Sequence, residues 1–315
     1  MSNRSTIVLG TRGSELAMWQ THWVQQQLLK LQPGLHIEVH VVKTQGDKIL
    51  DAPLSRIGDK GLFTKELENA LLDGRVDLAV HSLKDVPTQL EQGLTIGAVC
   101  EREDVSDVFI AHPEKKCPSL SSVPMKGTIA TGSLRRRCQL LRLRPDLSIV
   151  ELRGNLGTRV EKLKSSQWDG MLLAKAGITR LGRSELISEV LSPTTFLPAV
   201  GQGALAVEAR SNDERILSFV RPLDHIATRQ ATQGERALLR RLEGGCQIPI
   251  GAYGRIEHGT FRLDAIIGSL DGSRSVRSSI EGSPDHTERL GVSLAERLLA
   301  DGGEAILDEI RELNT

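Results

Sequence analysis

Residues 6–14 of this chain read TIVLGTRGS and residues 128–133 read TIATGS, and these two stretches decide the fold. In each, a short apolar run ends in threonine, glycine and serine just before a segment with helical periodicity. A second match follows each of them, LQPGLHI at 31–37 and LRPDLSI at 143–149. We therefore interpret the chain as an internal repeat of alternating strands and helices.

A third match places DLAVHSLK at 77–84 against DGMLLAK at 169–175. Between the second and third matches the first copy is longer by about 20 residues, which we place near Gly46 to Phe63. Loops of this length inside compact domains are often functional lids. We expect this insertion to act as a lid over a binding site.

Alternating strands and helices are typical of parallel sheets with βαβ connections, so the repeat predicts two α/β domains that face each other across a cleft. Ligands of such sheets bind at the carboxyl ends of the strands. Arg12 and Lys84 follow strands and are expected at those ends.

The pattern of alternating strands and helices ends after the second copy. Pro193 and Pro198 interrupt the pattern and precede a short strand at 204–207, which we interpret as a return to the first domain. Beyond it we predict a helix that begins near Thr232 with a capping box, a hairpin turn at Asp271-Gly272, and a closing helix over 290–299. The predicted division is 1–103 plus 201–221, then 104–200, then an α+β third domain with an antiparallel sheet over 222–315.

The composition is that of a globular protein. Of 315 residues, 39% are hydrophobic and 25% charged, and 40 Lys+Arg balance 40 Asp+Glu, which disfavours nucleic acid as a partner. The apolar runs are shorter than the roughly 20 residues that span a bilayer, so no membrane role is expected. Four cysteines without CxxC spacing indicate neither a disulfide framework nor a zinc site, and no metal is expected. The first strand starts too early to leave room for a signal peptide, so we expect a cytoplasmic protein.

Arginines concentrate in the second copy despite the zero net charge. Ser133 is placed to cap a helix whose exposed backbone N–H groups, with Arg135 and Arg136 beside them, would bind a carboxylate or phosphate. Arg153 and Arg159 add further partners for carboxylates. The alternatives are a solvated helix face and surface ion pairs. The equivalent arrangement around Arg12 in the first copy favours two anion sites.

Lys84-Asp85 follows an apolar strand and precedes Val86-Pro87, which prevents regular continuation of the chain. Flanked by cations, Asp85 should stay ionised and accept a hydrogen bond from a ring N–H or stabilise a developing cation. Alternatively, it simply caps a turn.

Cys246 lies in a glycine-flanked loop, EGGCQIP at 243–249, and is the best candidate for a reactive thiol. A buried, inert cysteine is the more common alternative for a lone cysteine. We assign that role to Cys138, which falls on the apolar face of its helix.

These segments together resemble the hydroxymethylbilane synthase (porphobilinogen deaminase) family over nearly the whole chain. The motifs that carry the resemblance are TRGS at 11–14, GDKGLFTKEL at 58–67, HSLKDVP at 81–87, GSLRR at 132–136, LRGN at 152–155, LPAVGQGA at 197–204 and LEGGCQ at 242–247. The resemblance implies two periplasmic-binding-protein-like α/β domains flanking a cleft, a small third domain, and a monomer.

The resemblance also implies the chemistry. A dipyrromethane cofactor, attached to Cys246 through a thioether, would prime the stepwise addition of four porphobilinogen molecules with loss of ammonia, and hydrolysis would release the linear tetrapyrrole hydroxymethylbilane on the route to porphyrins and haem. Asp85 would be catalytic, contacting pyrrole nitrogens and stabilising the cation formed as ammonia leaves. The cofactor would be held by Ser82, Lys84, Thr131, Ser133, Arg135 and Arg136. The substrate would be bound by Arg12, Ser14, Arg153, Arg159 and Arg180.

Two positions depart from the pattern of some relatives. Arg56 stands where they have lysine, and Gly132 where they have serine. The main alternative function is a non-catalytic two-domain protein that binds a polycarboxylate, which would have no use for Cys246. A nucleic-acid binder built on 135–144 is the other, and the zero net charge and 3% aromatic content disfavour it.

Overall fold

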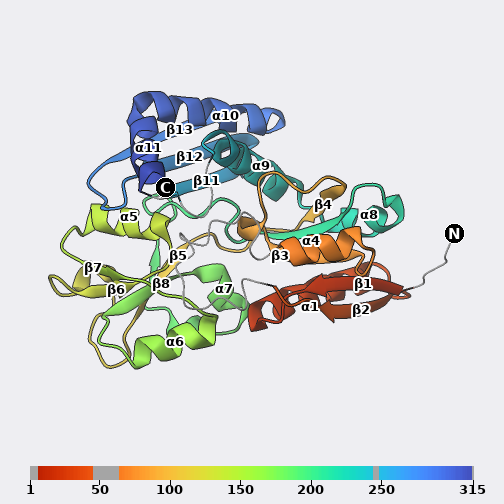
Figure 1. The fold of residues 1–315 in the computed structure, drawn as a ribbon, viewed down its shortest axis with the longest axis horizontal. Helices are drawn as coiled ribbons and strands as arrows, with labels where there is room; N and C mark the ends of the chain where they lie inside the picture. The colour runs from red at the N-terminus through yellow and green to blue at the C-terminus, as the bar shows by residue number, and fades with distance from the viewer. Residues whose placement is uncertain (1–5, 45–63, 244–247, 314–315) are drawn as a thin grey trace. The chain divides into compact units, whose positions relative to one another are not determined.

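The computed structural model describes residues 6–44, 64–243 and 248–313. These residues form two compact units, with boundaries at 103/104, 202/203 and 229/230. Each unit is built around a five-stranded sheet, and the second also holds a three-stranded sheet (Figure 1). Within the described residues, no helix combines the length and apolar composition that crossing a membrane requires.

The first unit has a sheet in the order β2-β1-β3-β10-β4. Its elements are β1 (Thr6–Thr11), α1 (Glu15–Leu31), β2 (His36–Val41), α4 (Lys65–Leu72), β3 (Leu78–Ser82), the 3₁₀ turn η1 (Leu83–Asp85), β4 (Leu94–Val99), β10 (Leu205–Arg210), α8 (Glu214–Val220) and η4 (Arg221–Leu223). The first three strands are parallel, as predicted, but β10 lies antiparallel between β3 and β4. The prediction that the chain returns to the first sheet after the second copy is confirmed by β10.

Helices cover both faces of this sheet, because successive side chains of β3 and β10 point to opposite faces and nearly all of them are buried. Leu9 and Val80 pack with α1 and α8 on one face, and Ala79 packs with Leu67 and Leu71 of α4 on the other. Figure 1 shows α1 and α4 on opposite sides of the sheet.

The α/β part of the second unit has the order β7-β6-β8-β5-β9, which repeats the first topology position by position. Its elements are β5 (Asp107–Ala111), η2 (Leu120–Ser122), β6 (Thr128–Ala130), α5 (Leu134–Leu143), β7 (Ser148–Val150), α6 (Leu156–Lys164), β8 (Gly170–Ala174), α7 (Lys175–Arg180), η3 (Ser184–Leu186) and β9 (Glu189–Leu191). Here β5 is the antiparallel fourth strand, the counterpart of β10. The predicted internal repeat is thereby confirmed, with mixed sheets in place of purely parallel ones.

An aspartate marks the same position in both copies. Asp77 Oδ2 accepts a hydrogen bond from Val8 N at 2.9 Å, and Asp169 Oδ2 accepts one from Thr128 N at 2.7 Å. The matching of Lys84 with Lys175 was wrong, because the strand registers make Lys175 the counterpart of Leu83. Lys175 instead opens α7 and pairs with Asp104 at 2.6 Å.

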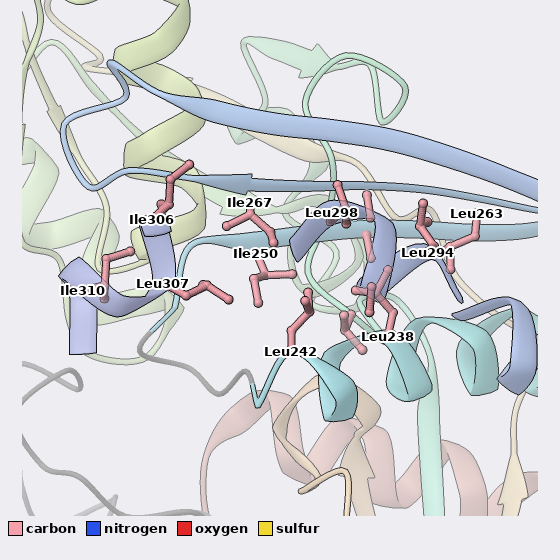
Figure 2. Packing of buried hydrophobic residues seen from close by; sticks show 14 of the residues in the cluster. Leu238, Leu242, Ile250, Leu263, Ile267, Leu294, Leu298, Ile306, Leu307 and Ile310 are labelled. Carbon is pink, nitrogen blue, oxygen red and sulfur yellow. The ribbon is translucent and has the colours of Figure 1, made fainter. Parts of the chain in front are cut away.

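The C-terminal part of the second unit is a three-stranded antiparallel sheet covered by helices. Its elements are α9 (Ile226–Arg241, whose first residues belong to the first unit), β11 (Ile250–Glu257), β12 (Thr260–Gly268), β13 (Ser275–Gly282), η5 (Pro284–His286), α10 (Thr287–Leu298), the π turn η6 (Leu299–Gly303) and α11 (Glu304–Glu312). Figure 2 shows Leu238, Leu263, Leu294 and Leu298 pointing into one shared core. The predicted small α+β domain with an antiparallel sheet is confirmed.

The helix start predicted near Thr232 was wrong, since α9 begins at Ile226 and Thr232 is buried inside it. Glu235 does not cap the helix. Its fully buried carboxylate accepts hydrogen bonds from Gly201 N and Gly254 N, both at 2.7 Å. The hairpin turn at Asp271-Gly272 is present, with Gly272 at φ +72°.

Candidate active site

The first unit brings together the predicted site residues Arg12, Ser14, Ser82, Lys84 and Asp85. Since β1 and β3 are parallel neighbours, the segments that follow them lie at the same edge of the sheet. Ser14 caps α1 by accepting a hydrogen bond from Ala17 N at 3.3 Å, as predicted from the repeat. We call this edge the first-unit site.

Lys84 and Asp85 are exposed to solvent on the turn that follows β3. Leu83 and Val86, on either side of them, are buried at 1% and 5% exposure, and Leu83 N donates to Ala204 O at 3.0 Å. Among the described residues, no donor bonds the Asp85 carboxylate, so it does not cap its own turn. An exposed carboxylate on an anchored turn is available to a ligand.

Ser82 is fixed by a residue that the sequence did not single out. Gln20, buried on α1, donates from Nε2 to Ser82 Oγ at 2.8 Å. The only signal in the sequence was a glutamine on the apolar face of a helix. The bond ties the end of β3 to α1.

The second unit contains the predicted site residues Thr131, Ser133, Arg135, Arg136, Arg153, Arg159 and Arg180, which we call the second-unit site. Ser133 caps α5, as predicted, and accepts a hydrogen bond from Arg136 N at 3.4 Å. Thr131 is buried at the end of β6, where its hydroxyl accepts from Ser133 N at 3.3 Å. These contacts shape the turn between β6 and α5.

Arg135 and Arg136 share one buried aspartate, Asp107. Arg135 Nη1 lies 2.6 Å from Asp107 Oδ2, and Arg136 Nη2 lies 2.8 Å from Oδ1. Although burial opposes ionisation, the two guanidinium groups hold the pKa of Asp107 well below its usual range. Among the described residues Asp107 is the one carboxylate they contact, so the cluster carries an excess positive charge.

No sequence pattern indicated Asp107 or the residues that orient this cluster. Gln202 Nε2 donates to Asp107 Oδ1 at 2.9 Å and to Val105 O at 2.7 Å. Arg135 Nη1 also donates to Leu197 O, whose backbone N–H in turn donates to Gln139 Oε1. Two residues of the motif at 197–204 are therefore bonded to this cluster, Leu197 to Arg135 and Gln202 to Asp107.

The remaining arginines follow β7 and β8. Arg159 Nε donates to Gly154 O at 2.7 Å, and Arg180 is buried at the end of α7. Two guanidinium nitrogens, Arg135 Nε and Arg153 Nη1, are buried without a hydrogen-bond partner among the described residues. Buried donors of this kind fit a ligand that carries carboxylates.

The departure at Gly132 has a steric explanation. A Cβ atom built there would lie 2.6 Å from Leu152 O and 2.9 Å from Glu151 Oε1. Both distances are shorter than van der Waals contact. Gly132 therefore lets the end of β7 approach the turn before α5.

Cys138 is a core residue, as predicted. It is 2% exposed, and burial raises the pKa of its thiol to about 12. Cys246, Arg56 and the predicted lid at 46–63 lie outside the described residues.

Comparisons with known proteins agree with this geometry. Residues 7–218 match the family described as "Porphobilinogen deaminase, dipyromethane cofactor binding domain", and residues 230–300 match "Porphobilinogen deaminase, C-terminal domain". The chain belongs to the porphobilinogen deaminase family. Both the resemblance found in the sequence and the dipyrromethane cofactor that it implied are confirmed at the level of this family.

Curated members of the porphobilinogen deaminase family match along their whole length. The porphobilinogen deaminase of Carboxydothermus hydrogenoformans is 50% identical over 308 residues, covering 98% of each chain. That of Desulforamulus reducens is 49% identical over 305 residues, covering 97% of this chain and 98% of its own. Among solved structures, the periplasmic VFT2 domain of Bordetella pertussis BvgS is similar with a TM-score of 0.42 and 15% identity, covering 70% of this chain and 86% of that one.

Proposed function

We propose that this chain is a hydroxymethylbilane synthase, which joins four porphobilinogen molecules head to tail with loss of ammonia and releases the linear tetrapyrrole by hydrolysis. The observation that carries the proposal is the arginine pair with one shared aspartate, in a chain whose family binds dipyrromethane. Porphobilinogen has acetate and propionate groups, so every added ring brings two carboxylates. A buried cationic cluster suits such a ligand.

The second-unit site has the groups to hold the cofactor. Arg135 and Arg136 would bind its carboxylates, with Thr131 and Ser133 beside them and with Ser82 and Lys84 contributing from the first-unit site. Cys246 would carry it as a thioether. When bound, the dipyrromethane supplies the pyrrole end to which the first substrate is joined.

The first-unit site would activate the incoming substrate. The substrate carboxylates would be bound by Arg12 and Ser14 of this site and by Arg153, Arg159 and Arg180 of the second-unit site, which together would fix the ring. Asp85 would accept a hydrogen bond from the ring N–H and stabilise the positive charge that develops on the substrate as ammonia leaves. We further propose that the chain has three domains and that the protein acts as a cytoplasmic monomer.

Intact-protein mass spectrometry with a turnover assay tests the function. We expect the purified chain to carry an added mass equal to two linked pyrrole units, and to convert porphobilinogen into a product of four pyrrole units with ammonia released. The Cys246→Ser variant should lack both the added mass and the activity. An unmodified yet active chain would contradict the covalent cofactor, and a modified chain that binds porphobilinogen without ammonia release would favour the non-catalytic alternative.

A further inference from the structure

The first unit contains a buried histidine–glutamate pair that the proposed function does not use. His81 Nε2 lies 3.1 Å from Glu208 Oε2, and the two side chains are 4% and 0% exposed. His81 stands on β3 and Glu208 on β10, on the face of the sheet that α4 covers. Burying such a pair costs solvation free energy that its mutual attraction does not always offset.

A third ionisable residue, Glu68 of α4, adds to this cluster. Burial raises the pKa of Glu68, and the neighbouring Glu208 carboxylate raises it further. Glu68 Oε1 and Glu208 Oε1 are both buried without a hydrogen-bond partner among the described residues. Three ionisable side chains with two unsatisfied oxygens are an unusual choice for a protein core.

The second copy of the repeat shows that the fold does not need this cluster. The strand registers make Leu173 the counterpart of His81 and Ile110 the counterpart of Glu208. Both are buried in an apolar cluster, and Val160, which stands as far before Asp169 as Glu68 does before Asp77, packs against it. The same sheet is thus built with apolar residues at these positions.

The two copies also differ directly after the strand in question. In the second copy, β8 runs straight into α7 at Lys175. In the first copy, β3 ends in the exposed turn that carries Lys84 and Asp85, and His81 lies one residue before Ser82, which is bonded to Gln20. The polar cluster therefore occurs only in the copy whose strand leads to Asp85.

We propose that His81 and Glu208 are positioning residues, whose hydrogen bond fixes the end of β3 and thereby the placement of Lys84 and Asp85. A directional hydrogen bond between β3 and β10 holds the end of β3 in one position. Apolar contacts at the same positions would tolerate small shifts of the strand. This inference rests on the proposed function, because it assigns the pair to the turn that carries the proposed catalytic carboxylate.

The test replaces the pair with the residues of the second copy, in the variant His81→Leu/Glu208→Ile. Because the pair is removed as a whole, and the Glu208 carboxylate that raises the pKa of Glu68 is removed with it, the unfolding midpoint should stay near that of the wild type. We expect kcat for porphobilinogen to fall roughly tenfold to a hundredfold with KM little changed, since a small misplacement of a catalytic group costs this much. Glu208→Gln, which keeps an oxygen to accept the His81 bond, should retain most of the turnover.

The measurements on the double variant distinguish a positioning role of the pair from a structural role and from a loss of the cofactor. Intact mass reports whether the variant still carries the two pyrrole units, so that a loss of kcat is assigned to turnover and not to cofactor assembly. A folded double variant with wild-type kcat overturns the inference, and so does a double variant that fails to fold, since the pair would then be structural. An inactive wild-type chain contradicts the proposed function instead.

Discussion

Arg136 donates two hydrogen bonds to a single carboxylate oxygen of Asp107, from Nε at 3.1 Å and from Nη2 at 2.8 Å. The other oxygen of Asp107 accepts a bond from Arg135 at 2.6 Å. All three side chains are buried, so the aspartate orients both guanidinium groups while neutralising only one of them. This arrangement holds the arginines in place and leaves positive charge for a ligand.

Replacing Asp107 with asparagine should destabilise the protein. Two buried cations would lose their common partner, and breaking a buried ion pair in this way costs about 3–5 kcal/mol. Chemical denaturation of Asp107→Asn measures the loss in the free energy of unfolding. Asp146→Asn, which removes an aspartate from a solvent-accessible pair with Arg144, should lose far less. Equal losses in the two variants would contradict the role given to Asp107.

The same aspartate predicts the acid dependence of stability. The folded pKa of Asp107 is lowered, so its contribution to stability is complete above the unfolded carboxyl pKa of about 3.9 and is lost as the pH falls toward the lower folded value. Below about pH 4, the unfolding midpoint should fall more steeply with decreasing pH in the wild type than in Asp107→Asn. Parallel curves would show that another group dominates acid unfolding.

Replacing Asp85 with asparagine should keep the cofactor and nearly abolish turnover. The side chain is exposed, so its loss of charge should leave the unfolding midpoint unchanged. The amide cannot stabilise a developing cation as a carboxylate does, and loss of one such electrostatic contact costs roughly 100-fold to 1,000-fold in kcat. Intact mass and kcat are measured on the same preparation. Wild-type turnover in this variant would remove Asp85 from catalysis.

Much of this site was predictable because the repeat is local in the sequence. The capping serines Ser14 and Ser133 and the turn at Lys84-Asp85 depend on short spacings, and the structure has them where they were expected. Asp107 was not predictable, because it meets the arginines only through the antiparallel strand β5, whose place in the sheet no local pattern indicates. Glu235 was misassigned to a capping box for a similar reason, since its partners Gly201 and Gly254 are distant in sequence.

The glycine at 132 should not tolerate serine in this chain. Its Cβ would come within 2.6 Å of a backbone oxygen, and overpacking of this kind typically costs about 1–3 kcal/mol. Gly157→Ser is the matched control, because a Cβ there meets no atom closer than 3.6 Å. Thermal unfolding of both variants provides the measurement. A Gly132→Ser protein as stable as the control would show that the end of β7 moves freely.

Cys246 should differ sharply in reactivity from the other three cysteines. Cys100, Cys117 and Cys138 are all buried, and the thiol of Cys138 has its pKa raised to about 12, so little thiolate forms at pH 8. We expect iodoacetamide to leave all three unlabelled in the native chain and to label them in denaturant. Cys246 should become reactive only in protein prepared without the cofactor. Native labelling of Cys138, detected by peptide mass mapping, would disprove its assignment to the core.

Glu235→Gln should loosen the loop that contacts Asp107. The glutamate accepts two backbone bonds, from Gly201 N and Gly254 N, whereas glutamine has one oxygen and places an N–H₂ group against a backbone donor. Leaving a buried donor unsatisfied costs about 1–3 kcal/mol. Glu243→Gln, near the end of the same helix and 79% exposed, should change stability by less than about 0.5 kcal/mol. Because Gly201 precedes Gln202, which bonds Asp107, cofactor occupancy by intact mass should also fall in Glu235→Gln but not in the control. A destabilised variant with full occupancy would confine Glu235 to a structural role.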